Sequence, residues 1–173
     1  MLLPNHQKDW GQAQVPPGKD QFVRWKVAAC AGLGAGVIAT IFEIALWAVL
    51  TDALPENFLR DTRFAAAIVM GRRVLGNPLD WQVVAVATLV HFALSMAYGL
   101  VLSLLIRRTS TLSSLAVGAA FGLSLYALNM YGFTTLFPWF EAARDSITVA
   151  THLAFGIAVA GVYRLLAHPS MRK

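Results

Sequence analysis

Four side chains that could do chemistry stand almost alone in long apolar stretches of the sequence: Glu43, His91, Asn129 and His152. At about 1.5 Å per residue, each lies roughly 8 to 14 Å from the same end of the expected bundle. A polar side chain in hydrocarbon costs several kcal/mol unless it has a partner. We therefore expect these four residues to face one another in the interior of a helical membrane protein.

Two interpretations of this cluster involve no prosthetic group. In the structural use, the four side chains form a hydrogen-bonded clasp that fixes the register of the helices. In the ligand-binding use, Glu43, His91 and His152 bind a metal ion, a proton or a small cationic solute, with Asn129 as a neutral partner. Two histidines and a carboxylate are a competent metal-ligand set, but one ligand per helix is no sequence motif.

A third use is redox chemistry, in which His91 and His152 are the axial ligands of a b-type haem. Gly99 and Gly156 would then make room for the macrocycle. The two histidine nitrogens would have to lie about 4 Å apart across the iron. Hydrolytic catalysis has little support, because no nucleophile elbow and no phosphate-binding loop is present, so we expect no enzyme.

The elements that position these residues are four apolar spans, at about 27–50, 82–106, 112–136 and 147–166. The chain has 57% hydrophobic and 13% charged residues, with a mean hydropathy of +0.59. Each span reaches the roughly 20 residues that a helix needs to cross a bilayer. The sequence predicts an all-α membrane protein, a four-transmembrane-helix bundle over 27–166, with a hydrophilic N-terminus (1–26) and a short tail (167–173).

Basic residues in the flanks predict the orientation, because the side richer in Lys and Arg faces the cytoplasm. The richer side holds Lys8, Lys19, Arg24, Lys26, Arg107, Arg108, Arg164, Arg172 and Lys173, and the other holds Arg60, Arg63, Arg72, Arg73 and Arg144. Both termini are then cytoplasmic, and the lipid bilayer is the expected partner. A nucleic-acid partner would need a basic face on a soluble module, which the sequence lacks.

Small residues share a helix face with each polar residue, at 7 and 11 positions before it in the first and third spans and 4 and 8 positions after it in the second and fourth. These packing residues are Gly32 and Gly36, Ser95 and Gly99, Gly118 and Gly122, and Gly156 and Ala160. All lie on the cytoplasmic side of the polar residue of their span, and small pairs let helix backbones approach closely. The bundle is therefore expected to close on the inside and to open outward around a polar cavity.

The spacings also match between the two halves of the chain. Spans one and three read G-x3-G-x6-[E/N], and spans two and four read H-x3-[S/G]-x3-[G/A]. At the expected outer mouth, Arg60-Asp61 is echoed by Arg144-Asp145, where Asp145 or Ser146 could cap the fourth span. The pattern favours two parallel helical-hairpin repeats, although Gly and Ala are common enough in membrane helices to match by coincidence.

The loop between the first two spans, residues 51–81, contains an amphipathic stretch. We expect a short helix there, with Asp61 or Thr62 as its N-cap and Asn77-Pro78 as its stop. It would lie at the outer interface, either as a simple surface anchor or as a lid over the cavity.

Several short runs carry a resemblance that covers about residues 27–166. They are V-A-T-L-V-H-F-A-L-S-M-A-Y-G, N-M-Y-G-F-T, F-P-W-F, A-R-D and T-H-L-A-F-G. In these runs the chain resembles a group of small four-helix membrane proteins from Proteobacteria, some of which carry a sodium:proline symporter label. Transporters of that class are built from inverted repeats with broken helices, so this chain could approach their architecture only as an oligomer.

The expectation for function has two forms. The favoured form is a non-enzymatic accessory subunit or small carrier-like bundle that handles a cation, a proton or a small solute, alone, as a homo-oligomer or in a larger membrane complex. The alternative is a haem b- or quinone-binding redox subunit.

Overall fold

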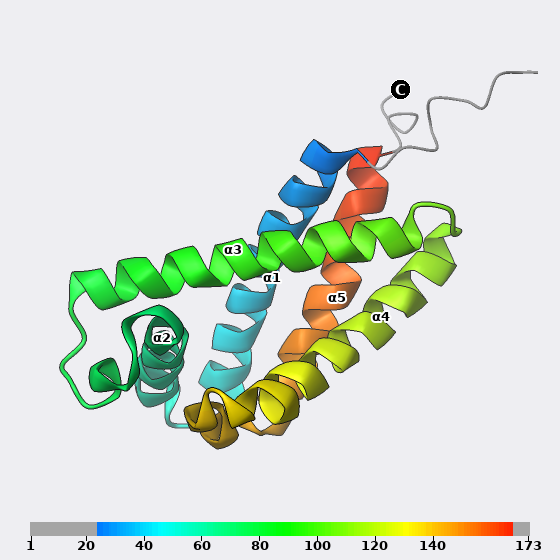
Figure 1. Ribbon diagram of the computed structural model, residues 1–173. Coiled ribbons are helices and arrows are strands. Elements are labelled where there is room, and N and C mark those ends of the chain that lie inside the picture. The colour runs from blue at the N-terminus through cyan, green and yellow to red at the C-terminus, as the bar shows by residue number, and fades with distance from the viewer. Residues whose placement is uncertain (1–23, 168–173) are drawn as a thin grey trace, which may run out of the picture.

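Four long helices make up most of the molecule in a computed structural model that describes residues 24–167 (Figure 1). They are α1 (Trp25–Leu50), α3 (Trp81–Ile106), α4 (Thr111–Ala127) and α5 (Ser146–Ala167). No strand occurs between residues 24 and 167. Most of the predicted hydrophilic N-terminus and of the tail, residues 1–23 and 168–173, lies outside the described residues.

These helices are long and apolar enough to cross a membrane. The spans are α1, α3, the segment Thr111–Thr135 and α5, with mean hydropathies of 2.1, 2.1, 1.6 and 1.6. Large apolar side chains such as Ile41 and Leu89 are exposed on the outside of the bundle, as expected where lipid is the solvent. The predicted all-α four-helix membrane fold is confirmed, and the chain is a multi-pass membrane protein by the length and composition of its helices.

Three of the spans begin at a side chain that caps the helix. Asp80, Ser110 and Asp145 each accept a hydrogen bond from the backbone N–H three residues later, at 2.8, 3.2 and 2.8 Å. Such caps satisfy one of the amide groups that the first helical turn leaves without a partner. The prediction that Asp145 caps the fourth span is confirmed.

The third span is not a regular α-helix to its end. After α4 the chain forms a π-helical turn, η3 (Leu128–Gly132), and then a 3₁₀ turn, η4 (Phe133–Thr135). Arg144 supports this change of geometry, because its Nε donates to the carbonyl oxygen of Met130 at 2.6 Å and its Nη2 to Oγ1 of Thr134 at 3.0 Å. Irregular backbone at membrane depth needs such partners. The third span is therefore helical to Thr135 but is not a regular α-helix beyond Ala127.

The predicted helix of the first loop is longer than expected and begins earlier. It is α2 (Leu54–Met70), with Pro55 in its first turn, where a missing N–H costs nothing. Asp61 and Thr62 lie in the middle of α2, so neither is its N-cap. The helix stops at Gly71, whose φ of 80° is the one positive value between residues 24 and 167.

The helix α2 is not a loose surface element. A short 3₁₀ turn, η2 (Arg72–Leu75), follows it, and a second one, η5 (Pro138–Ala143), precedes α5. Ala66 and Ala67 of α2 are fully buried in a small apolar core that includes Val83 of α3. In Figure 1, α2 and the segment before α5 lie at the end of the bundle away from the marked C-terminus; we call this the α2 end.

The four spans pair as two helical hairpins. The chain pairs α1 with α3 and α4 with α5, and the two hairpins join along α1 and α5, whereas α3 and α4 share few contacts despite the short turn between them. In Figure 1, α3 crosses α1 at a wide angle. The opposite end of the bundle, which we call the turn end, holds the α3–α4 turn (107–110) and both described termini.

Small residues sit at the close crossing of the first hairpin. A Cβ atom added to Gly32 would lie under 3.0 Å from the backbone of Ser95 and Met96, and one added to Gly99 would lie equally close to the backbone of Gly32. One added to Gly36 would meet the side chain of Ser95 at 2.7 Å. Because only hydrogen fits at these points, the residues permit the backbone contact that a larger side chain would prevent.

The second hairpin crosses in the same way, at the matching positions. An added Cβ on Gly118 would lie under 3.0 Å from the backbone of Gly156 and 3.0 Å from Ala160, and one on Gly122 would lie under 3.0 Å from the backbone carbonyl of His152. Both crossings therefore lie on the turn-end side of the four polar residues. The two hairpins share this geometry, as two parallel repeats would.

The turn end is closed by Arg164 of α5, which is only 9% exposed. Its Nε donates to Oγ of Ser114 at 2.7 Å, and its Nη2 donates to the carbonyl oxygens of Ile106, at 2.7 Å, and of Thr109. The last carbonyls of a helix have no partner within the helix. Arg164 thus supplies, from α5, the donors that the end of α3 and the α3–α4 turn require.

Candidate functional site

A cavity of about 430 Å³ lies between the two hairpins. On every span, its lining residues fall on the α2-end side of the small-residue crossing or at its edge. The polar lining consists of Glu43, Asp61, His91, Ser95, Tyr98, Asn129, Thr148, Thr151 and His152. All four intramembrane residues expected to meet therefore line one cavity.

At the α2 end, where the sequence predicts an opening, the connecting elements contribute to the cavity lining. Asp61, Ala65 and Ile68 of α2 line it there, together with Phe140 and Ala143 of η5. The two elements that connect the spans are thus part of its wall. This placement agrees with the alternative in which the loop helix covers the cavity.

Asn129 and His152 form one hydrogen-bonded group with Tyr98. His152 Nδ1 donates to the carbonyl oxygen of Thr148 at 2.8 Å, so Nε2 accepts from Nδ2 of Asn129 at 3.2 Å. The hydroxyl of Tyr98 donates to Oδ1 of the same Asn129 at 3.3 Å. The donors and acceptors are mutually consistent and fix the His152 tautomer that carries its proton on Nδ1. This group ties α3, η3 and α5 together.

His91 belongs to a separate group on α1. Its Nε2 lies 3.2 Å from Oγ1 of Thr40 and 3.4 Å from the carbonyl oxygen of Gly36. The Thr40 hydroxyl itself donates to that carbonyl at 3.0 Å, which leaves its oxygen to accept from His91. His91 therefore holds α3 against α1.

Glu43 stands apart from both groups. Within residues 24–167 it makes no ion pair within 4.0 Å and no hydrogen bond to the other three residues. Its carboxyl group faces Thr151 of α5 and is an electrostatic neighbour of Asp61, Asp145 and Arg60. The expectation that all four residues form one hydrogen-bonded cluster was wrong: they share a cavity but bond in separate groups.

Two hydroxyl groups of the cavity lining lack a partner within the described residues. The side chains of Thr148 and Thr151 are 4% and 8% exposed, both line the cavity, and Oγ1 of each makes no hydrogen bond to the described residues. Buried polar atoms are satisfied in most native structures, so each exception needs an explanation. These hydroxyls and the Glu43 carboxyl group are among the polar groups of the cavity lining that remain available to a ligand.

The metal and haem expectations do not fit this geometry. Among residues 24–167, no three His, Cys, Asp or Glu side chains come close enough together to hold a metal ion, so Glu43, His91 and His152 do not form a ligand set. Both ring nitrogens of His152 are already in hydrogen bonds, and neither is free to ligate a haem iron. Releasing one would break the link to Asn129 or to Thr148.

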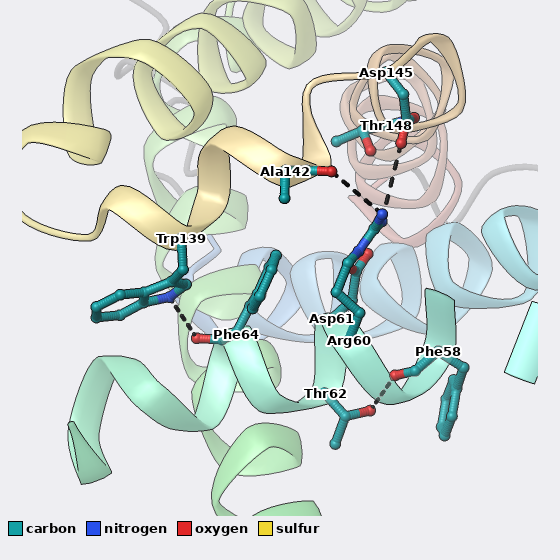
Figure 2. A network of polar contacts seen from close by, with 9 residues as sticks. All are labelled: Phe58, Arg60, Asp61, Thr62, Phe64, Trp139, Ala142, Asp145 and Thr148. Carbon is teal, nitrogen blue, oxygen red and sulfur yellow. Dashed lines mark hydrogen bonds and ion pairs between the residues drawn. The ribbon is translucent and has the colours of Figure 1, made fainter. Parts of the chain in front are cut away.

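A polar network holds α2 against η5 and against Asp145, just before α5 (Figure 2). Arg60 donates from Nε to Oδ1 of Asp61 at 2.7 Å and from Nη1 to the carbonyl oxygen of Ala142 at 3.3 Å, and its Nη2 lies 3.9 Å from Oδ2 of Asp145. Burial raises the pKa of Asp61, while the guanidinium of Arg60 opposes that rise.

The four residues predicted at the outer mouth therefore do not all meet. Arg60, Asp61 and Asp145 meet across the α2 end, but Arg144 turns away to hold the π-helical turn. A further hydrogen bond, from Nε1 of Trp139 to the carbonyl oxygen of Phe64 at 3.2 Å, links η5 to α2 in Figure 2.

Three of the polar lining residues were missed in the sequence. Thr148 lies four residues before His152 and Thr151 lies three residues after Thr148, so helical spacing places all three near one face. Tyr98 lies seven residues after His91, on the same face of α3. These hydroxyl residues are uncharged, and a search for charged or imidazole side chains in apolar spans passes over them.

Comparisons of this chain with protein-family models, with curated proteins and with solved structures find no match.

Proposed function

We propose that the protein is a non-enzymatic, membrane-embedded binding protein or carrier for a small solute, which occupies the cavity between the two hairpins. The observation that carries this proposal is that Glu43, Thr148 and Thr151 line a cavity of about 430 Å³, where the two hydroxyls make no hydrogen bond and Glu43 makes no ion pair within the described residues. Small-molecule sites typically have volumes of about 300 to 1,000 Å³ and an apolar lining with a few polar groups.

The remaining polar residues have a structural part in this proposal. Asn129, His152 and Tyr98, and likewise His91 with Thr40, satisfy one another and fix the helices that form the walls. Interhelical hydrogen bonds of this kind set register in membrane bundles. The cavity thus combines a clasp, which holds its shape, with a small set of open acceptors, which bind.

The route to the cavity in this proposal is the α2 end. The turn end is closed by backbone contacts at both glycine crossings, and these cannot part without separating the helices. At the α2 end the cover is held by Arg60, Asp145 and Trp139 in contacts that are partly exposed. Partly exposed ion pairs are worth little, about 1 kcal/mol or less. The polar contacts of α2 with η5 and α5 can therefore part while α2 stays packed on α3.

We propose further that both termini face the cytoplasm of a bacterial inner membrane, so that the cavity is reached from the periplasm. The distribution of Lys and Arg supports this orientation. In a Cys30→Ala background, a cysteine at Ala142 should react with a membrane-impermeant thiol reagent in intact cells. A cysteine at Ser110 should be shielded, and its labelling would contradict the orientation.

Binding in the cavity can be tested with three probes that share a phenyl body: 2-phenylethylamine, 2-phenylethanol and 3-phenylpropionate. At least one of them should raise the unfolding temperature of the protein in lipid nanodiscs in a saturable way. A ligand at one hundred times its dissociation constant stabilises a protein by about 2.7 kcal/mol.

Two variants place a large side chain inside the cavity, Ala65→Phe and Ile68→Trp, and should abolish the stabilisation. Ala93→Phe adds the same bulk to an exposed position of α3 outside the lining and is the matched control. If every stabilisation survives both filling variants, or if no probe stabilises the protein, the proposed function is wrong.

A further inference from the structure

We propose that the solute carries an ammonium group, and that Glu43, Thr148 and Thr151 bind it at one wall of the cavity while an apolar body fills the rest. This inference rests on the proposed function and adds the chemical class of the ligand. Three observations support it: unpartnered acceptors, an excess of carboxylates and the apolar character of the remaining lining.

The first observation is that Thr148 and Thr151 lack a hydrogen bond that other helical hydroxyl groups of the described chain make. Thr40, Thr88 and Ser103 each donate to the carbonyl oxygen four residues earlier, at 3.0, 2.8 and 2.7 Å. Thr148 and Thr151 are at least as buried as Thr40 but make no such bond within the described chain. Their oxygens are therefore available to a donor that enters the cavity.

The second observation is the charge around these oxygens. Glu43, Asp61 and Asp145 are electrostatic neighbours, and Arg60 is the one guanidinium placed among them. Arg60 is bonded to Asp61 and lies beside Asp145, which leaves Glu43 without an ion-pair partner in residues 24–167. Arg144 is paired with Glu141 instead. The local balance favours a ligand that brings a positive charge.

The third observation is that each open polar group at this wall, the Glu43 carboxyl group and the two hydroxyls, can accept a hydrogen bond. A primary ammonium has three N–H donors, and a carboxylate with two hydroxyl oxygens offers at least three acceptors. The amide of Asn129 and the imidazole of His152, which could have served a negatively charged or acceptor ligand, are already bonded to each other. A carboxylate solute would instead meet the carboxyl groups of Glu43 and Asp61 in the same lining.

The apolar lining separates an organic ammonium from a bare metal ion. Ile68, Leu94, Phe133, Phe137 and Phe140 form much of the remaining wall. An inorganic cation held at Glu43 would leave most of a cavity of about 430 Å³ facing these side chains without a partner. An ammonium group on an apolar or aromatic body fills both parts, and aromatic faces add an attraction for cations.

The test compares the three phenyl probes on the full-length protein in nanodiscs. The wild type should bind 2-phenylethylamine at least tenfold more tightly than 2-phenylethanol, and 3-phenylpropionate more weakly than either. Glu43→Gln should reduce the preference for the amine to about onefold while the affinity for the alcohol stays unchanged. Thr148→Val and Thr151→Val, which keep the side-chain shape, should each lower the affinity for the amine several-fold.

The matched control is Thr88→Val, because Thr88 is an exposed residue of α3 outside the cavity and should leave all three affinities unchanged. Equal binding of amine and alcohol that Ala65→Phe abolishes would overturn this inference and leave the proposed function standing. Failure of all three probes would overturn both. Saturable stabilisation by Na⁺ alone that Glu43→Gln removes, without a preference for the amine, would show a metal-ion site and also contradict the inference.

Discussion

The two hairpins of this bundle have similar helix crossings but differ in how their polar side chains are hydrogen-bonded. In each hairpin, two glycines of the first helix lie at the crossing, opposite small residues of the second helix. A histidine of the second helix lies four positions before the first of those small residues. In the α1–α3 hairpin, the histidine bonds to its own hairpin partner, and Glu43 remains unpaired. In the α4–α5 hairpin, the residue that matches Glu43 is Asn129, and it bonds directly to the histidine.

This difference separates two kinds of polar residue in one membrane interior. The α4–α5 hairpin satisfies its strongly polar pair internally but leaves two threonine hydroxyls open, whereas the α1–α3 hairpin satisfies its hydroxyl and leaves a carboxylate open. The open groups of both face the same cavity. If the satisfied groups serve stability and the open groups serve binding, mutations in the two sets should have opposite signatures.

The largest effect should come from the glycine crossings, where the matching positions Gly36 and Gly122 differ in what they contact. An added methyl group at Gly122 meets the backbone of His152 and Leu153, which cannot move, while one at Gly36 meets the side chain of Ser95. Gly122→Ala should cost about 2 to 3 kcal/mol and Gly36→Ala about 1 kcal/mol in thermal unfolding in detergent. Leucine at either position should disrupt packing severely.

Gly34→Ala is the control for these two substitutions, because the nearest atom to its added Cβ is a Val162 methyl at 3.9 Å. It should cost nothing, since alanine favours a helix over glycine. Equal losses at all three positions would show that the crossings are not the tight points of the bundle.

The next effect concerns the Asn129–His152 pair. Asn129→Ala and His152→Ala should each cost about 1 to 2 kcal/mol, because each leaves a buried partner unsatisfied. A double-mutant cycle should give a coupling of about 0.6 to 1.7 kcal/mol, the range of hydrogen bonds between membrane helices. The parallel cycle on Glu43 and His152 should give a smaller coupling, since no hydrogen bond joins them. The reverse order would restore a single cluster of four residues.

The open hydroxyls should behave in the opposite way. In the absence of added solute, Thr148→Val and Thr151→Val should leave thermal stability unchanged or raise it by about 1 kcal/mol, because each removes a buried polar atom without a partner. Thr40→Val, which removes the partner of His91, should instead cost about 0.5 to 1 kcal/mol. A loss at Thr148 or Thr151 as large as that at Thr40 would mean that these hydroxyls are satisfied in the folded protein.

The smallest effect should come from Arg60 at the α2 end. Arg60→Met should cost less than about 1 kcal/mol, as for other partly exposed ion pairs. It should raise the pKa of Asp61 further, because the cation that favours the ionised form is lost. The raised pKa gives a stability contribution that is present at low pH and is lost as the pH rises through the pKa of the folded state.

A titration of the carboxyl carbon of Asp61 by NMR measures this change. Arg63→Met is the control, since Arg63 donates to the backbone of Asn77 and not to Asp61. A pKa of Asp61 that stays the same without Arg60 would show that the pair does not form in solution.

The sequence predicted the elements of this fold better than their ends and their contacts. The four spans could be predicted within about two residues, because apolar length is a direct requirement of the bilayer. The π-helical turn at Leu128–Gly132 could not be foreseen, since its support comes from Arg144, twelve or more residues along the chain. The start of α2 was missed because an internal Asp-Thr pair resembled a cap more closely than Pro55 did.

The candidate site shows the same limit. The similar depths of Glu43, His91, Asn129 and His152 in their spans predicted that they would lie close together, and all four line one cavity. Which of them form hydrogen bonds with one another depends on the rotation of each helix, which the sequence does not reveal. Thr40, only three residues before Glu43, took the histidine that a carboxylate was expected to bind. Helical periodicity predicts which residues share a face, and the crossing geometry decides which of them touch.

Arg164 has a consequence for the order in which the protein is made. The turn between α3 and α4 depends on donors from the final helix, so it cannot reach its finished form when those two helices first leave the ribosome. Until α5 is inserted, the carbonyl groups of that turn lack the donors of Arg164 and are open to water. A chain cut short before residue 164 would keep them in that state, so an ordered α3–α4 turn marks a protein whose last helix has been inserted.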